Sequence, residues 1–273
     1  MSLFEALVIV LAGLLAGTIN TVVGSGTLIT FPTLLFFGYA PVAANVSNTW
    51  GLVAAAITGA WGYRREIRET RHQIVQLLPM SIIGSIIGAL LLLALPAAAF
   101  DAIVPVLIAL ALLLVVFGGR LNAWAQRHRV EAETGTKTGG AATGAVGGPA
   151  LSRGRRLALL GGVFFGGIYG GYFGAAQGVL VMGVMNVLLP LSLQHLNAIK
   201  NILTPCANLV AAIVFFFVAR DQINWAVAGL IALGAFGGGW VGARVGRSLS
   251  PQALRATIVV IGLVAIAKLV VFP

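Results

Sequence analysis

The chain has 273 residues, of which 59% are hydrophobic and only 9% are charged. A soluble domain carries about 25% charged residues, so this composition argues against a soluble enzyme or a nucleic-acid-binding module and indicates a protein whose solvent is a lipid bilayer. The 17 Lys and Arg residues against seven Asp and Glu residues give a net charge of +10. These charges gather in short stretches between apolar segments, which is typical of basic cytoplasmic loops and does not indicate a nucleic-acid partner.

Ten apolar segments follow one another along the chain. The first half contains Leu3–Val22, Thr27–Phe37, Val42–Tyr63, Ile74–Leu95 and Ala97–Phe117, and the second half contains Leu157–Tyr172, Val179–Leu189, Leu196–Val218, Ile223–Val245 and Ala253–Val271. A membrane-spanning helix needs about 20 residues. The second segment of each half is about half that long and follows a glycine-rich stretch. We therefore predict an all-α membrane protein with a short broken or re-entrant helix in each half.

A polar stretch separates the two halves. It covers residues 119–156, and its centre, Gly135–Gly148, consists mainly of Gly, Ala and Thr with one lysine, Lys137, which favours a flexible loop. The expected organisation is a transmembrane repeat over 1–118, a linker over 119–156 and a second transmembrane repeat over 157–273. The linker is predicted to be cytoplasmic because it carries seven basic residues, which are Arg120, Arg127, Arg129, Lys137, Arg153, Arg155 and Arg156.

The charges of the other loops indicate that the two repeats have inverted topology. In the first half the basic loop, Arg64–Arg71, follows the third segment. In the second half that loop is nearly neutral, and Arg244, Arg247 and Arg255 flank the next one. Equivalent loops would then face opposite sides of the membrane, with the amino terminus in the periplasm. Gly24 matches Gly174 and Asn45 matches Asn197 in the same order along the two halves.

The glycine-rich breaks are the strongest candidates for a transport site. They cover Asn20–Thr27 and Gly170–Gly178, with Gly24, Gly26, Gly174 and Gly178 as the helix-breaking glycines. Each break begins a short helix whose free N–H groups carry a partial positive charge, and two such ends facing one another can bind an anion. The alternative is that the glycines only permit close packing of helices.

Lys200 is the most distinctive single residue because it lies inside an apolar segment. A cation within the bilayer is costly, so Lys200 is expected either to bind the substrate anion or to extend to the headgroups. His195, near the start of the same segment, either forms a local hydrogen bond or contributes to substrate or proton handling. In the first half Asn48 occupies the position equivalent to Lys200. The predicted substrate-binding residues are Asn20, Ser25, Thr27, Asn48, Thr49, Gln177, Asn197, Lys200 and Asn201.

Motifs for enzyme chemistry are missing from the sequence. It contains no phosphate-binding loop and no His-Glu-x-x-His motif, and its single cysteine, Cys206, has no partner for a disulfide. We therefore predict no cofactor, no metal and no catalytic residue. The apolar segments also lack a carboxylate placed as a proton relay. The identity of a coupling ion, either proton or sodium, therefore stays open.

The pattern of glycine cluster, short apolar stretch, proline and polar helix start occurs twice. It covers Gly17–Pro32 with Ala43–Thr49, and Gly167–Pro190 with Asn197–Asn201. This pattern, together with the ending Ile223–Arg244, resembles the TauE/SafE family of sulfite exporters and sulfonate-uptake permeases. The resemblance implies a multi-pass transporter of the bacterial inner membrane for small sulfur-containing anions such as sulfite and sulfoacetate. The second cluster departs from a pure glycine run at Gln177, and the role of Lys200 does not come from the resemblance.

These observations predict a secondary transporter that moves a small anion by alternating access, with its site between the paired broken helices. An anion channel built from the same helix ends is the first alternative, and a membrane enzyme or scaffold subunit is the second. The expected partners are the anion and the lipid bilayer, and the protein is expected to be a monomer or a homodimer.

Overall fold

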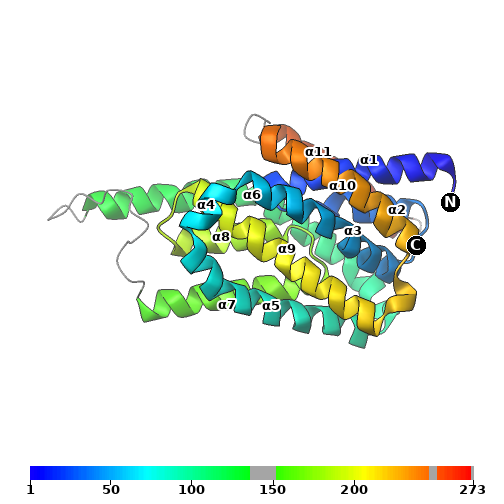
Figure 1. Ribbon diagram of the computed structural model, residues 1–273, viewed down its shortest axis with the longest axis horizontal. Helices are drawn as coiled ribbons and strands as arrows, with labels where there is room; N and C mark the ends of the chain where they lie inside the picture. The colour runs from blue at the N-terminus through cyan, green and yellow to red at the C-terminus, as the bar shows by residue number, and fades with distance from the viewer. Residues whose placement is uncertain (136–151, 246–250, 272–273) are drawn as a thin grey trace.

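The computed structural model describes residues 1–135, 152–245 and 251–271, and within these ranges the chain is helical with no strand. The first half forms α1 (Leu3–Val22), α2 (Thr27–Phe36), α3 (Pro41–Gly62), α4 (Arg64–Glu69), α5 (Arg71–Ala94) and α6 (Ala97–Gly135). The second half forms α7 (Arg153–Tyr172), α8 (Gln177–Leu188), α9 (Leu193–Val218), the 3-10 helix η1 (Arg220–Gln222), α10 (Trp225–Val245) and α11 (Pro251–Val271), as Figure 1 shows.

Helix length and composition confirm an all-α membrane protein. Five of the described helices, α1, α5, α6, α9 and α10, contain stretches long and apolar enough to cross a bilayer. By contrast, α2 has 10 residues and α8 has 12. At a rise of 1.5 Å per residue they extend about 15 and 18 Å, roughly half of a 30 Å hydrocarbon core. Each half therefore contains one short helix directly after its glycine-rich break, as the sequence predicts.

Two stretches expected to be irregular are helical. The basic stretch after α3 forms the six-residue helix α4, in which Arg65 Nε pairs with Glu69 Oε1 at 3.3 Å, one turn apart. Helix α6 continues through the first part of the predicted linker to Gly135 and extends beyond the bundle (Figure 1). The sequence explains this continuation, because Ala, Arg, Gln and Glu are strong helix formers and no proline interrupts them. Most of the glycine-rich centre of the linker lies outside the described residues.

The two halves interlock through reciprocal helix pairs. Helix α1 of the first half packs along α10 of the second half, while α7 of the second half packs along α5 of the first. Glycines allow both contacts, since a Cβ added at Gly17 would lie 2.8 Å from Ala235 Cα and one added at Gly167 would lie 2.6 Å from the Ser81 carbonyl oxygen. Helices α3 and α9 contact one another. In Figure 1, α1 starts at the right-hand end of the molecule and α7 starts at the left-hand end.

Candidate functional site at the crossed helix breaks

Both long helices that precede a break end in the same way. At the end of α1, the N–H groups of Val23 and Gly24 both donate to the Ile19 carbonyl, at 2.7 and 3.0 Å. At the end of α7, Phe173 and Gly174 donate to the Tyr169 carbonyl at 2.9 and 3.0 Å. Gly24 and Gly174 also share a left-handed conformation, with φ of 87° and 75°. Such φ values favour glycine, which explains why the two breaks carry a glycine at matching positions.

The two breaks touch each other through Gly24 and Gly178, and we call this contact the crossing. The Gly178 N–H donates to the Gly24 carbonyl at 3.1 Å. A Cβ added at either residue would lie 2.6 Å from the Cα of the other, which is closer than non-bonded carbon atoms come. Phe31 on α2 and Phe173 in the second break pack edge to face next to this crossing, with ring centroids 5.1 Å apart. The backbone of each half therefore reaches the other only because neither glycine has a side chain.

The carboxyl ends of α1 and α7 each receive a polar side chain from the opposite half. Lys200 Nζ on α9 donates to the Thr21 carbonyl at 3.2 Å, and Asn45 Nδ2 on α3 donates to the Tyr172 carbonyl at 3.0 Å. These carbonyls belong to the last turn of each helix, where the backbone lacks helical partners and the dipole is negative. The Lys200 side chain is only 1% exposed, so it stays inside the protein and does not extend to the headgroups.

Asn48 and two threonines form a satisfied polar cluster in the first half. The Asn48 amide donates to Thr27 Oγ1 at 3.3 Å, and the Thr30 hydroxyl donates to Asn48 Oδ1. All three side chains are buried. Thr49, next along α3, donates its hydroxyl to the Asn45 carbonyl of its own helix at 2.8 Å. The Asn48, Thr27 and Thr30 side chains therefore already have protein partners.

Several buried side chains have polar atoms without a partner among the described residues, and four of these side chains lie in the breaks, at the start of α8 or on α9. They are Ser25 Oγ in the first break, both amide atoms of Gln177 at the start of α8, Asn201 Nδ2 and Thr204 Oγ1. Ser25 and Gln177 are fully buried. Leaving one buried donor or acceptor unpaired costs about 1–3 kcal/mol, so native proteins seldom keep a group of them together. These atoms can hydrogen-bond a polar ligand that enters the crossing.

Helix α9 carries its polar residues along both breaks. Lys200 reaches the end of α1, and a Cβ added at Gly174 would lie 3.6 Å from Asn208 Oδ1, so Asn208 lies next to the second break. Asn201 and Thr204 lie between these two positions on the same helix. Thr204 and Asn208 are absent from the predicted residues. Their spacing of four from Lys200 was an available signal, because residues four apart share one face of a helix.

Two of the predicted residues are less buried than the others. Asn20 and Asn197 are half-buried. The Cβ of Asn20 lies 3.0 Å from the position that a Cβ of Gly26 would take, which places Asn20 against the first break. Asn45, which matches Asn197 in the sequence, contacts the second break directly. The structure thus brings Ser25, Thr27, Gln177 and Lys200 to the two breaks, with Asn48 bonded to Thr27.

Comparison with known proteins decides the family. The family described as "Sulfite exporter TauE/SafE" matches residues 9–269. The chain belongs to the TauE/SafE family. It is 25% identical to the "Probable membrane transporter protein YfcA" of Escherichia coli K12 over 263 residues, covering 96% of this chain and 88% of the relative. A "Probable membrane transporter protein" of Haemophilus influenzae is 24% identical over 261 residues, covering 94% of this chain and 91% of the relative. No solved structure is significantly similar.

Membership in the TauE/SafE family confirms the resemblance drawn from the glycine clusters and shows a multi-pass membrane protein of a transporter family. The match includes both breaks and the helices that hold them, since it begins within α1 and ends within α11. The crossing therefore lies inside the part of the chain that matches the family.

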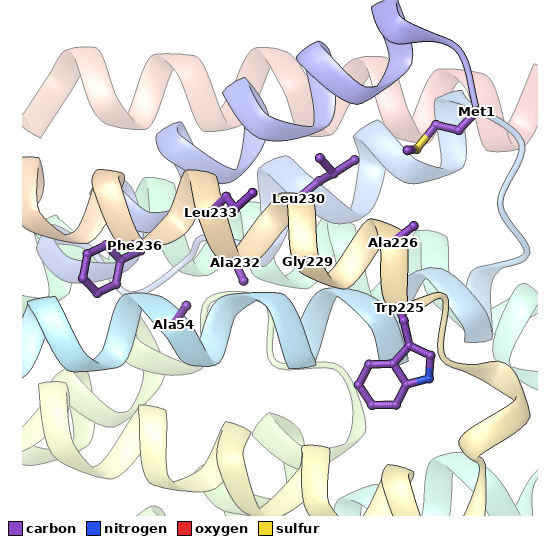
Figure 2. Close-up of a pocket in the computed structure, with 9 residues that line it drawn as sticks. All are labelled: Met1, Ala54, Trp225, Ala226, Gly229, Leu230, Ala232, Leu233 and Phe236. Atoms are coloured by element: carbon purple, nitrogen blue, oxygen red, sulfur yellow. The ribbon is translucent and has the colours of Figure 1, made fainter.

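An apolar groove on the outside of this TauE/SafE protein does not have the chemistry of an anion site. It runs along α10 and has a volume of about 700 Å³. Figure 2 shows Trp225 at one end and Phe236 at the other, with Gly229 between them and Ala54 of α3 alongside. The lining has no charged side chain and almost no polar surface. A charged solute would lose its hydration there without gaining hydrogen bonds.

His195 forms a local contact at one end of the bundle, away from the crossing. Its Nε2 atom lies 2.8 Å from Glu69 Oε2 of α4, and its Nδ1 atom lies 2.7 Å from the Ser192 hydroxyl. The hydrogen bond from His195 lowers the pKa of the Glu69 carboxyl, and the bond from Arg65 adds to this effect. His195 therefore ties the start of α9 to α4, which fits the expectation of a local hydrogen bond.

This contact predicts a pH dependence of stability. Because the folded protein lowers the pKa of Glu69, the ionised carboxylate stabilises the fold above its unfolded pKa, and this contribution disappears as pH falls through the lower folded value. We expect Glu69→Gln to melt at a slightly lower temperature than wild type at pH 7, and the two proteins to converge below pH 4. The difference should be small, since the pair is solvent-exposed. Melting curves of both proteins between pH 3 and pH 8 test this, and an unchanged gap at acid pH would contradict it.

Proposed function

We propose that this TauE/SafE protein is a secondary transporter that moves a small sulfur-containing or organic anion, such as sulfite, sulfoacetate or another sulfonate, across the bacterial inner membrane. The observation that carries this proposal is the contact between the two helix breaks. It brings the amino-terminal ends of α2 and α8 close to unpartnered buried groups of Ser25 and Gln177. Helix amino termini and neutral hydrogen-bond donors together are suited to an oxyanion.

The charge balance at the crossing supports an anion that presents a single sulfonate group to Lys200. Among the described residues, Lys200 is the one charged side chain that is buried. Its ammonium group can balance one negative charge, while the Gln177 and Asn201 amides can donate hydrogen bonds to the remaining oxygen atoms. A sulfonate group presents three oxygen atoms that share one charge, which matches a single cation surrounded by neutral donors.

The arrangement of the halves supports alternating access. Reciprocal pairing of α1 with α10 and of α7 with α5 supports a site between the two halves, and α1 and α7 start at opposite ends of the molecule (Figure 1). In transporters with inverted repeats, rocking of one unit against the other exposes a central site to each side in turn. The loop charges favour a cytoplasmic linker and a periplasmic amino terminus.

Ligand-induced thermal stabilisation of the purified protein tests the substrate class. A ligand that binds only the folded protein at 100 times its Kd stabilises it by about 2.7 kcal/mol. We expect sulfite or sulfoacetate to raise the melting temperature, while sulfate, taurine and chloride at equal ionic strength raise it less. Equal melting temperatures with all five solutes would overturn the proposed substrate class.

A further inference from the structure

Within the part of the chain that the structure describes, Lys200 has no partner of opposite charge. Its Nζ atom makes one hydrogen bond, to the neutral Thr21 carbonyl, and it forms no ion pair among the described residues. An ammonium group has three N–H donors, so the bond to Thr21 leaves two of them unused. A neutral amine has two N–H donors and can keep the same bond to Thr21.

The helices around Lys200 supply no fixed negative charge to it. Helix α9 packs against α3, α4, α5, α7, α8 and η1, and α1 provides the Thr21 carbonyl. Of these, α3 and α8 have no titratable side chain. The other elements carry Glu5, Arg64, Arg65, Glu66, Arg68, Glu69, Arg71, His72, Arg153, Arg155, Arg156, Tyr169, Tyr172, His195, Cys206, Arg220 and Asp221. The carboxylates among them lie in the first turn of α1, in α4 and in η1, and no Asp or Glu of the described residues is buried.

A buried ammonium without a counter-ion is strongly disfavoured relative to the neutral amine. Lys200 is therefore stable as an amine when no anion is present, and as an ammonium when an anion lies beside it. The same residue can thus take up a proton when substrate binds and lose it when substrate leaves.

We infer that Lys200 carries the coupling proton, so that this transporter moves one proton together with each anion. The step is balanced: the Lys200 amine, one proton from water and the anion give an ammonium–anion pair, and release on the other side returns the amine, the proton and the anion. No bond of the substrate is made or broken. This inference rests on the proposed anion transport and adds the identity of the coupled ion, for which the described membrane helices offer no buried carboxylate.

Proton uptake on binding tests the inference directly. Sulfoacetate is a suitable probe, because its sulfonate and carboxylate groups are both fully ionised at alkaline pH. The probe itself therefore takes up and releases no proton in that range. We expect wild-type protein in weakly buffered dye solution at alkaline pH to take up about one proton for each sulfoacetate bound. The measured affinity should then fall by up to tenfold for each pH unit in that range, which is the limit for one linked proton.

Two variants separate the effect of a positive charge at position 200 from the effect of proton uptake and release by Lys200. Lys200→Arg keeps a permanent charge, because arginine does not lose its proton in proteins, and should bind sulfoacetate without proton uptake and with little pH dependence. Lys200→Met removes the charge and should lose most of the binding. Wild-type binding without proton uptake and with a pH-independent affinity would overturn the proton role and leave anion transport standing. Failure of wild type to bind sulfoacetate or any other anion of the panel would overturn both.

Discussion

Replacing Gly178 by alanine is expected to lower the melting temperature and to abolish anion-induced stabilisation. The new Cβ would lie 2.6 Å from Gly24 Cα and 2.9 Å from the Gly24 carbonyl oxygen. Both neighbours are backbone atoms, so the breaks themselves have to separate. Overpacking of this kind typically costs about 1–3 kcal/mol. Gly24→Ala should cost at least as much, since it adds the strain of a left-handed alanine to the same collision.

Gly229→Ala is the matched control for this pair of substitutions. Gly229 is also helical and lies in a membrane helix, but a Cβ added there meets no atom within 4 Å. Alanine is favoured over glycine in a helix by about 1 kcal/mol, so this variant should be as stable as wild type or slightly more stable. Melting curves with and without sulfoacetate compare the three variants. Gly178→Ala protein with wild-type stability and binding would show that contact between the breaks is not required.

Gln177→Leu should stabilise the protein without ligand and weaken anion binding at the same time. Both amide atoms of Gln177 are buried without a partner among the described residues. Leucine has a similar size and needs no hydrogen bond, so the free energy of unfolding should rise by about 1–2 kcal/mol. If the amide binds the anion, the same change removes a hydrogen bond to the ligand. A gain of stability accompanied by a loss of function is typical of a residue retained for binding.

Asn48→Leu provides the opposite case. The Asn48 amide bonds to Thr27 and Thr30, so its removal breaks two hydrogen bonds and should lower the melting temperature. Chemical or thermal unfolding of both variants measures the contrast. A Gln177→Leu protein that is destabilised as strongly as Asn48→Leu would indicate that Gln177 supports the fold and is not held ready for a ligand.

The sequence predicted the breaks because both of their causes are local. Glycine is favoured at the left-handed positions of Gly24 and Gly174, and α2 and α8 are too short to span a bilayer. The family also followed from these clusters. The contact between Gly24 and Gly178 could not be predicted, because it joins residues more than 150 positions apart and depends on how the halves pack. The partner of Lys200 was missed for a similar reason, since a backbone carbonyl carries no sequence signal.

Counterflow in proteoliposomes tests the central claim of an anion carrier most directly. Vesicles containing the purified protein are loaded with unlabelled sulfoacetate and diluted into a trace of labelled sulfoacetate. A carrier with a site exposed alternately to each side exchanges internal for external substrate, so the label should accumulate transiently above its equilibrium level. In Gly178→Ala vesicles this accumulation should be lost, while Gly229→Ala vesicles should behave as wild type. Entry of label only to equilibrium, without a transient excess, would indicate a channel and contradict the account.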